Sequence, residues 1–167
     1  MSRVSPEIRL EVQGLRELQR KAIAAVRALE GPPLMEAIKR ATLLVIAESK
    51  RLAPADTGIL RASITPKVEV DGPKTRGIVG SNVVYAPYME LGTGTFVGKP
   101  PHFPPPSALE VWAERHGFSS GFVVALSIFK QGGLRPRKFL QRGLERNEYK
   151  IGELIKAAVK KIAQGKK

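Results

Sequence analysis

Residues 64–84, ITPKVEV-DGP-KTRG-IVGSNVV, decide the fold because they predict a β-hairpin. Ile64, Val68 and Val70 mark the first expected strand and residues 78–84 the second, because Ile and Val suit a pleated, half-buried surface. Asp71-Gly72-Pro73 lies between them and is typical of a turn. Pro66 has no N–H to donate, so the first strand is expected at a sheet edge or with a bulge.

Apolar residues at helical spacing predict two helices before the hairpin. The first lies within residues 15–29 and stops before Gly31-Pro32-Pro33. The second spans about residues 34–52 and ends before Pro54. A strand is expected at residues 8–12, where apolar and polar side chains alternate.

The chain after the hairpin predicts a long loop and three helices. Residues 92–106 are so rich in Gly, Pro and Thr that we expect no regular element there, and long loops of this kind are commonly functional. Ser107-Ala-Leu-Glu110 fits a capping box at the start of a short helix that ends at His116-Gly117. A helix over residues 122–129 should stop at Gly132-Gly133, and a last one should run over about residues 138–163.

These elements predict an α+β fold. A small antiparallel sheet, formed by the N-terminal strand and the central hairpin, packs against two or more helices. The long Pro/Gly loop and the C-terminal helix complete it. The 167 residues suit one domain, expected over residues 1–163, with residues 164–167 as a frayed basic tail.

Composition excludes several classes of protein. The chain has no cysteine, which rules out disulfides, thiolate metal sites and a cysteine nucleophile. The longest apolar runs, residues 43–47 and 122–126, are far shorter than the roughly 18 residues that span a bilayer, and no secretion signal is visible at the N-terminus. We therefore expect no membrane partner.

Positive charge is concentrated at the C-terminal end. The net charge is +13, and residues 130–167 hold 12 basic and 3 acidic residues. Such a field favours polyanions or an acidic protein surface. The residues that could face DNA in the C-terminal helix are Lys150, Lys156, Lys160 and Lys161. The alternatives are that they face an acidic neighbour or remain solvated.

No motif predicts catalysis or a cofactor. Residues 94–99 resemble the middle of a phosphate-binding loop, but the residues that this motif requires at its two ends are missing. Val97 stands where a dinucleotide-binding fingerprint needs glycine. A hydrolase could use Asp56, Glu90 or His102, but these show no known spacing of nucleophile and base. We expect Asp56 to cap the turn that follows Pro54 instead. We predict no enzyme and no catalytic, cofactor-binding or metal-ligating residues.

Four segments in order carry a resemblance to a known family. They are Ala53-Pro54-Ala-Asp56-Thr57-Gly58-Ile-Leu60-Arg61-Ala-Ser63-Ile64, then Gly80-Ser81, then Tyr85-Ala86-Pro-Tyr88-Met-Glu90-Leu-Gly92-Thr93, and finally Pro136-Arg-Lys-Phe139-Leu140. Together they resemble the signature of the tail-completion and head-tail joining proteins of long-tailed bacteriophages. The resemblance covers roughly residues 34–163, and the stretch at residues 96–133 is longer than the shortest version of the pattern.

The resemblance implies a structural subunit of the virion neck or tail. Such a subunit is assembled in the host cytoplasm into a homo-oligomeric ring, most plausibly six-fold, between portal-side neck proteins and the tail tube protein, and genomic DNA passes through it. A stand-alone, non-specific nucleic-acid-binding protein is the alternative that the basic charge leaves open.

The long loop is the expected subunit contact. Its candidate anchors are Phe96, Pro101, Phe103 and Pro105. Tyr85 and Tyr88 either supply further anchors or pack the hairpin onto the second helix. Arg61 and Glu90, which have opposite charges, could pair between two of the motif segments.

Overall fold

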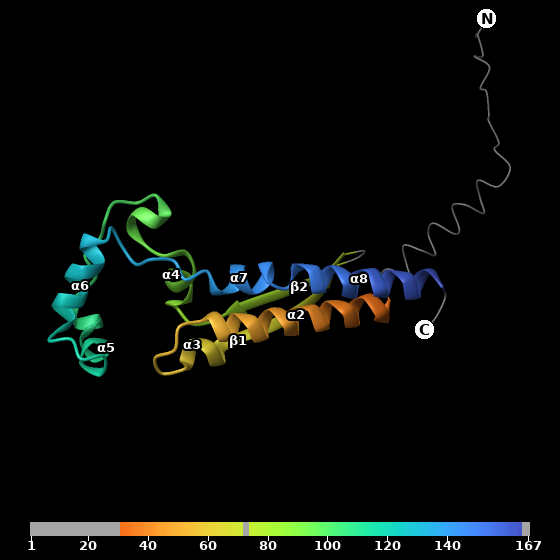
Figure 1. Ribbon diagram of the computed structural model, residues 1–167, viewed down its shortest axis with the longest axis horizontal. Coiled ribbons are helices and arrows are strands. Elements are labelled where there is room, and N and C mark those ends of the chain that lie inside the picture. The colour runs from red at the N-terminus through yellow and green to blue at the C-terminus, as the bar shows by residue number, and fades with distance from the viewer. Residues whose placement is uncertain (1–30, 72–73, 165–167) are drawn as a thin grey trace, which may run out of the picture.

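The computed structural model describes residues 31–71 and 74–164, and its fold is α+β (Figure 1). The strand predicted at residues 8–12, the helix predicted within residues 15–29 and the turn at Gly72-Pro73 lie outside the described residues. The predicted tail also lies outside them, except for Gln164, which caps the last helix.

The long helix α2, Pro32–Leu52, is the centre of the fold. Pro32 stands at its first position, where no backbone N–H is needed and the fixed φ of proline already suits a helix. The helix ends because Ala53 is extended, the conformation that a following proline favours. The predicted helix at residues 34–52 is therefore confirmed to within two residues at its start.

A β-hairpin packs against α2. Strands β1, Ile64–Asp71, and β2, Lys74–Ser81, are antiparallel, with Ile64 opposite Ser81. The described residues form a sheet of these two strands alone, so the strand that holds Pro66 lies at an edge, as predicted. The second strand begins four residues earlier and ends three residues earlier than predicted, because the chain turns at residue 82 toward helix α4, Ala86–Leu91.

Two helices replace the single C-terminal helix of the prediction. They are α7, Phe139–Glu145, and α8, Glu148–Ala163. The break is at Arg146-Asn147, because the buried Asn147 side chain donates a hydrogen bond of 2.9 Å to the carbonyl of Gly143, and such local side-chain bonds compete with the helical ladder. Both helices pack along α2.

Arginine and glutamate side chains hold this break against α2. Glu48 of α2 accepts hydrogen bonds of 2.7 Å from both Arg51 and Arg146. These two bonds lower the pKa of the Glu48 carboxyl from 4.5 to about 2, with the bond from Arg51 the larger cause.

The segment between the motifs forms a separate projection, which we call the arm and define as residues 93–134. It contains the 3₁₀ turns η1, Gly94–Val97, and η2, Pro106–Ala108, and the helices α5, Glu110–Arg115, and α6, Gly121–Lys130. Both helices end where predicted, with His116 as the cap of α5 and Gly132 in a left-handed conformation. The absence of regular structure predicted over residues 92–106 is wrong at η1.

The predicted capping box is also wrong. Ser107 lies inside η2, and α5 begins only at Glu110 without a side-chain cap. Glu110 caps a different helix: its Oε2 accepts a hydrogen bond of 2.7 Å from the N–H of Gly121, the first residue of α6. The acceptor is therefore used across the arm rather than within its own helix.

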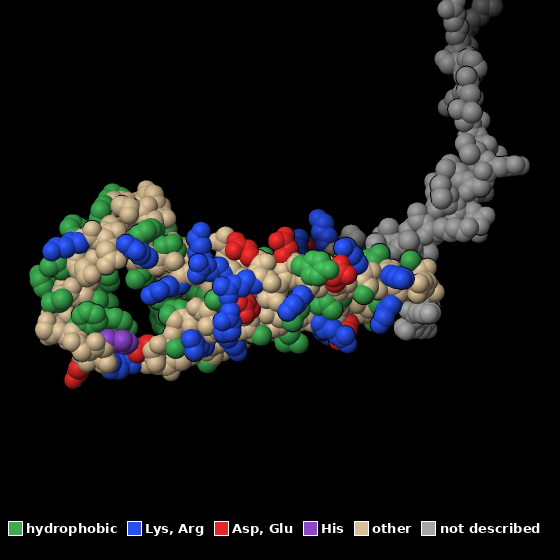
Figure 2. Space-filling view, viewed as in Figure 1, with side chains coloured by type: hydrophobic (Ala, Val, Ile, Leu, Met, Phe, Trp, Pro, Cys, Tyr) green, Lys and Arg blue, Asp and Glu red, His purple; other side chains and the backbone are tan. Residues whose placement is uncertain are grey.

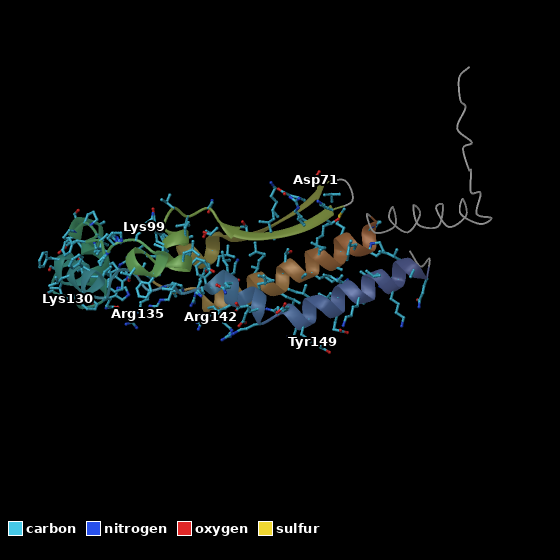
Figure 3. The ribbon with its side chains drawn as sticks, turned by 90° about the horizontal axis from the view of Figure 1, so that it is seen from above. Asp71, Lys99, Lys130, Arg135, Arg142 and Tyr149 are labelled. Atoms are coloured by element: carbon cyan, nitrogen blue, oxygen red, sulfur yellow. The ribbon has the colours of Figure 1, made fainter. Side chains whose placement is uncertain are left out.

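The layers are visible when the molecule is seen from above. Helix α2 lies between the hairpin on one side and α7 with α8 on the other, and the arm lies at one end (Figures 1 and 3). Near the base of the arm, the short helix α3, Ile59–Ser63, leads into β1.

Candidate assembly site

Three of the four motif segments meet at one hydrophobic core, and the fourth, Gly80-Ser81, lies between Val79 and Val83, which pack against that core. This core is formed by Ile46, Ala53, Leu60, Ile64, Ala86 and Phe139. Phe139 is fully buried, and Leu140 packs against the same cluster. The apolar motif residues therefore build the scaffold that joins α2, the hairpin and α7.

Two motif serines link the ends of the hairpin strands. The hydroxyl oxygens of Ser63 and Ser81 lie 2.7 Å apart, within hydrogen-bond distance. Ser63 also donates to the carbonyl of Leu60, and the N–H of Val83 donates to the Ser81 hydroxyl. These bonds fix the exit of the chain from β2 toward α4.

The Asp-Thr-Gly turn performs a different task from the one predicted. Gly58 caps α3 in the left-handed conformation, with φ 81°, which side chains disfavour. The predicted turn-capping role of Asp56 is wrong, because its side-chain hydrogen bond goes to Arg115 rather than to a backbone N–H of the turn. Its carboxylate instead pairs with Arg115 of the arm at 2.7 Å, and Nε2 of His116 lies 3.9 Å away. Asp56 thus ties the arm to the body.

Glu90 joins α4 to α7. Its two carboxylate oxygens accept hydrogen bonds of 2.9 Å from the N–H groups of Leu140 and Gln141, which have no partner within the first turn of a helix. Arg61 donates to the carbonyl of Ala53 at 2.9 Å. The predicted Arg61–Glu90 pair is therefore wrong, because each charge already has a different backbone partner.

Gly92 and Thr93 form the base of the arm. Gly92 has φ 81°, and a Cβ there would lie 2.6 Å from the carbonyl oxygen of Leu134. The N–H of Thr93 donates to that same carbonyl at 2.9 Å, and the Thr93 hydroxyl accepts from the N–H of Leu134 at 2.8 Å. The motif thus requires a glycine so that the two ends of the arm can approach closely.

The predicted contact residues are exposed. Tyr88 retains 54% of its accessible surface and Tyr85 retains 43%. Packing of these rings onto α2 does not account for such exposure, and Val83 and Met89 contact the core in their place. Phe96, Pro101, Phe103 and Pro105 are likewise exposed on the arm.

The basic residues divide into two groups. Lys150, Lys156, Lys160 and Lys161 are all exposed on α8, and Lys156 pairs with Glu153 at 2.9 Å. A second group, not singled out from the sequence, is Arg135, Arg137, Lys138 and Arg142.

The second group, which we call the basic band, runs from the segment that follows the arm into α7, where Arg142 lies. It falls within residues 130–144, which hold five basic residues and no acidic one, and this run is the sequence signal that could have revealed it. Lys and Arg side chains gather on the face shown in Figure 2, and Figure 3 places Arg135 and Arg142 along one edge.

Candidate catalytic residues are not assembled into a recognisable set. Asp56 and Glu90 are each engaged in a different structural contact, and His102 is exposed in the arm. Among residues 31–71 and 74–164, no group of three or more His, Asp or Glu side chains is placed to hold a metal ion. In the same part of the chain, no helix combines the length and the apolar character needed to cross a membrane.

Comparison of the chain with models of known protein families, with curated proteins and with solved structures finds no match. The functional argument therefore depends on the residues and their geometry.

Proposed function

We propose that this chain is a structural subunit of the neck or tail of a long-tailed bacteriophage. In this role it forms a homo-oligomeric ring, six-fold by the family resemblance, that completes the tail and joins it to the portal-side neck proteins. DNA passes through the ring, and the chain catalyses no reaction. It acts in the virion after assembly in the bacterial cytoplasm.

One observation carries the proposal: the four family-like segments are joined physically as well as in order. Apolar residues of three of them share one core, the hydrogen bond between Ser63 and Ser81 joins the fourth to the first, and Glu90 and Gly92 make contacts that position the neighbouring chain. Beside this core, Tyr85 and Tyr88 remain about half exposed, as aromatic anchors of an interface would be in a free subunit.

Electron microscopy of the purified chain, alone and mixed with isolated tails and DNA-filled heads, tests the proposal. We expect rings in concentrated samples or density at the junction of head and tail. Phage that lack the product should accumulate unjoined heads and tails. Infectious virions with normal junctions in its absence would refute the proposal.

A matched pair of substitutions separates assembly from folding. Tyr88→Ser changes a motif residue with 54% exposure, whereas Leu43→Ser changes a residue outside the motifs with 59% exposure on α2. Neither should lower the melting temperature by much, because both side chains are largely solvated. We expect only Tyr88→Ser to prevent ring formation, measured by light scattering.

The basic band supports a second candidate function, non-specific nucleic-acid binding. Arg135, Arg137, Lys138 and Arg142 are exposed, and none makes an ion pair with a described residue. If the chain is a stand-alone binder, it should bind unrelated duplexes with similar affinity. The logarithm of that affinity should fall with the logarithm of the salt concentration, with a slope of about 0.9 for each phosphate contacted. A ring that only guides DNA predicts weak binding by the isolated chain.

A further inference from the structure

The arm exposes an aromatic face on a small core. The rings of Phe103 and Phe122 lie 5.6 Å apart between centroids, and those of Phe103 and Phe129 lie 6.1 Å apart. Their exposed fractions are 39%, 54% and 43% for Phe103, Phe122 and Phe129. We call these three residues the aromatic face. They meet from the Pro-rich loop and from α6, so they form one continuous surface.

The interior of the arm contains small side chains in their place. Ala113 and Ala125 are fully buried, and Val124 is nearly so. This arrangement reverses the usual one, in which large apolar residues are inside and small ones tolerate exposure. The large rings are therefore available for a contact outside the arm.

The area of exposed rings is substantial. An aromatic side chain buries about 150–250 Å² when fully covered, so the three rings leave about 200–340 Å² exposed. With Phe96 and Phe118, which are also exposed on the arm, the total is about 330–560 Å². A standard interface buries about 800 Å² on each partner. The aromatic face alone can thus provide about a quarter to two fifths of one side of a standard interface.

An open apolar groove lies on the body. It has a volume of about 340 Å³ and is bounded by α2, β2, α7 and α8. Apolar side chains provide most of its lining, among them Ile38, Val45, Val79, Leu144 and Ile151. Leu144 is 53% exposed, so the groove is open on one side within residues 31–71 and 74–164.

We propose that the aromatic face of one copy docks into the groove of a second copy. This inference rests on the proposed ring and identifies its contact. Two different surfaces on each subunit make a heterologous interface, which closes into a ring when the rotation between subunits permits. Each copy then places its own arm in the groove of one neighbour and holds the arm of another neighbour in its own groove.

Charge favours this occupant over the basic C-terminal part of a second copy, where residues 135–167 hold 11 basic and 3 acidic residues. The arm holds three basic and two acidic residues, a net charge of +1, whereas the whole chain carries +13. A strongly basic body repels a second basic body. The nearly neutral arm can approach it without that repulsion.

The Asp56–Arg115 ion pair prepares the arm for docking. The arm joins the body through the close pairing of Thr93 with Leu134, and the ion pair of 2.7 Å adds a second point of attachment. Two attachments restrict the directions in which the arm can project. A contact that is already oriented loses less entropy on binding.

The absence of cysteine makes a direct test possible. One full-length variant carries Phe122→Cys on the arm, and another, with a different tag, carries Leu144→Cys in the groove. They are mixed at high concentration, oxidised and analysed by non-reducing electrophoresis. The control mixes Phe122→Cys with Lys160→Cys, which is exposed on α8 away from the groove lining. Light scattering on the same samples measures the oligomeric state.

We expect a disulfide-linked product with both tags from the arm and groove pair, and little from the control pair. Adding Phe129→Ser to the arm variant should weaken association about 30-fold, the effect of losing one aromatic anchor. Circular dichroism checks that this variant is folded.

Three results would overturn the inference. An oligomer without the mixed product would reject the arm contact and leave the ring proposal standing. A monomer without the product, at every concentration, would reject both. Pairing of Leu144→Cys with Leu10→Cys inside a single chain would show that the N-terminal segment occupies the groove.

Discussion

The contact between α2 and α7 at Gly143 gives the sharpest prediction for stability. A Cβ at Gly143 would lie 2.2 Å from the Ser49 hydroxyl oxygen and 3.1 Å from both the Ser49 nitrogen and the Val45 carbonyl oxygen. Rotation of the Ser49 side chain can relieve the first contact, but the two backbone atoms belong to α2 and cannot rotate away. Gly143→Ala should therefore push α7 from α2 by a few tenths of an ångström.

A second glycine provides the control. Gly152 lies inside α8, and a Cβ there would meet nothing within 4 Å. Replacing a helical glycine with alanine stabilises a helix by about 1 kcal/mol, and this gain applies at both positions. Overpacking costs about 1–3 kcal/mol, and it applies only at Gly143. The free energies of unfolding of the two variants should thus differ by about 1–3 kcal/mol, with Gly152→Ala the more stable.

Urea unfolding followed by circular dichroism measures this difference. The urea concentration at the midpoint of unfolding should rise for Gly152→Ala relative to the unchanged chain. For Gly143→Ala it should lie below that of Gly152→Ala by an amount equivalent to the steric cost. If Gly143→Ala were as stable as Gly152→Ala, the close approach of α7 to α2 would be refuted.

Three further predictions concern the polar contacts. Glu48 has a folded-state pKa of about 2, below its ordinary 4.5. Its ion pairs therefore stabilise the fold above pH 4.5, and this stabilisation is lost as the pH falls toward 2. In Glu48→Gln, the melting temperature should lack that part of its dependence on acid pH. Glu90→Ala should lower the free energy of unfolding by about 0.5–2 kcal/mol, because the cap of α7 is lost. In a double-mutant cycle with Arg61→Met, the effects of the two substitutions on the free energy of unfolding should be additive, because the two side chains do not pair. Asp56→Asn should hardly change the melting temperature but should speed hydrogen exchange in the arm, because the pair with Arg115 is partly exposed; unchanged exchange would show that the base of the arm suffices to hold it.

Local sequence signals placed the main elements of the described chain. Apolar spacing and prolines located α2, and glycines located the ends of α5 and α6, since both act through the conformation of a few neighbouring residues. The same reasoning failed at the C-terminus. Helical spacing continues through Asn147, but its side chain is buried against α2, where it bonds to the Gly143 carbonyl and lies 3.5 Å from the Leu44 carbonyl oxygen.

The partners of charged motif residues were beyond sequence reasoning. Asp56 and Arg115 are 59 positions apart, and Glu90 is 50 positions from Leu140. Opposite charge suggested that Arg61 and Glu90 would pair, but backbone groups satisfy both. No local pattern distinguishes these outcomes.

The class of fold, the basic C-terminal end and the four ordered segments are evident from the residues alone, because propensity, charge and turn chemistry depend on residues close together in the chain. Only the contacts between distant parts of the chain show that three of these segments share a core around Phe139, that Asp56 holds an arm, and that the arm leaves its aromatic rings exposed. The physical reason is that burial and hydrogen-bond partners are set by where distant segments meet, and packing chooses among partners that the sequence leaves equally open.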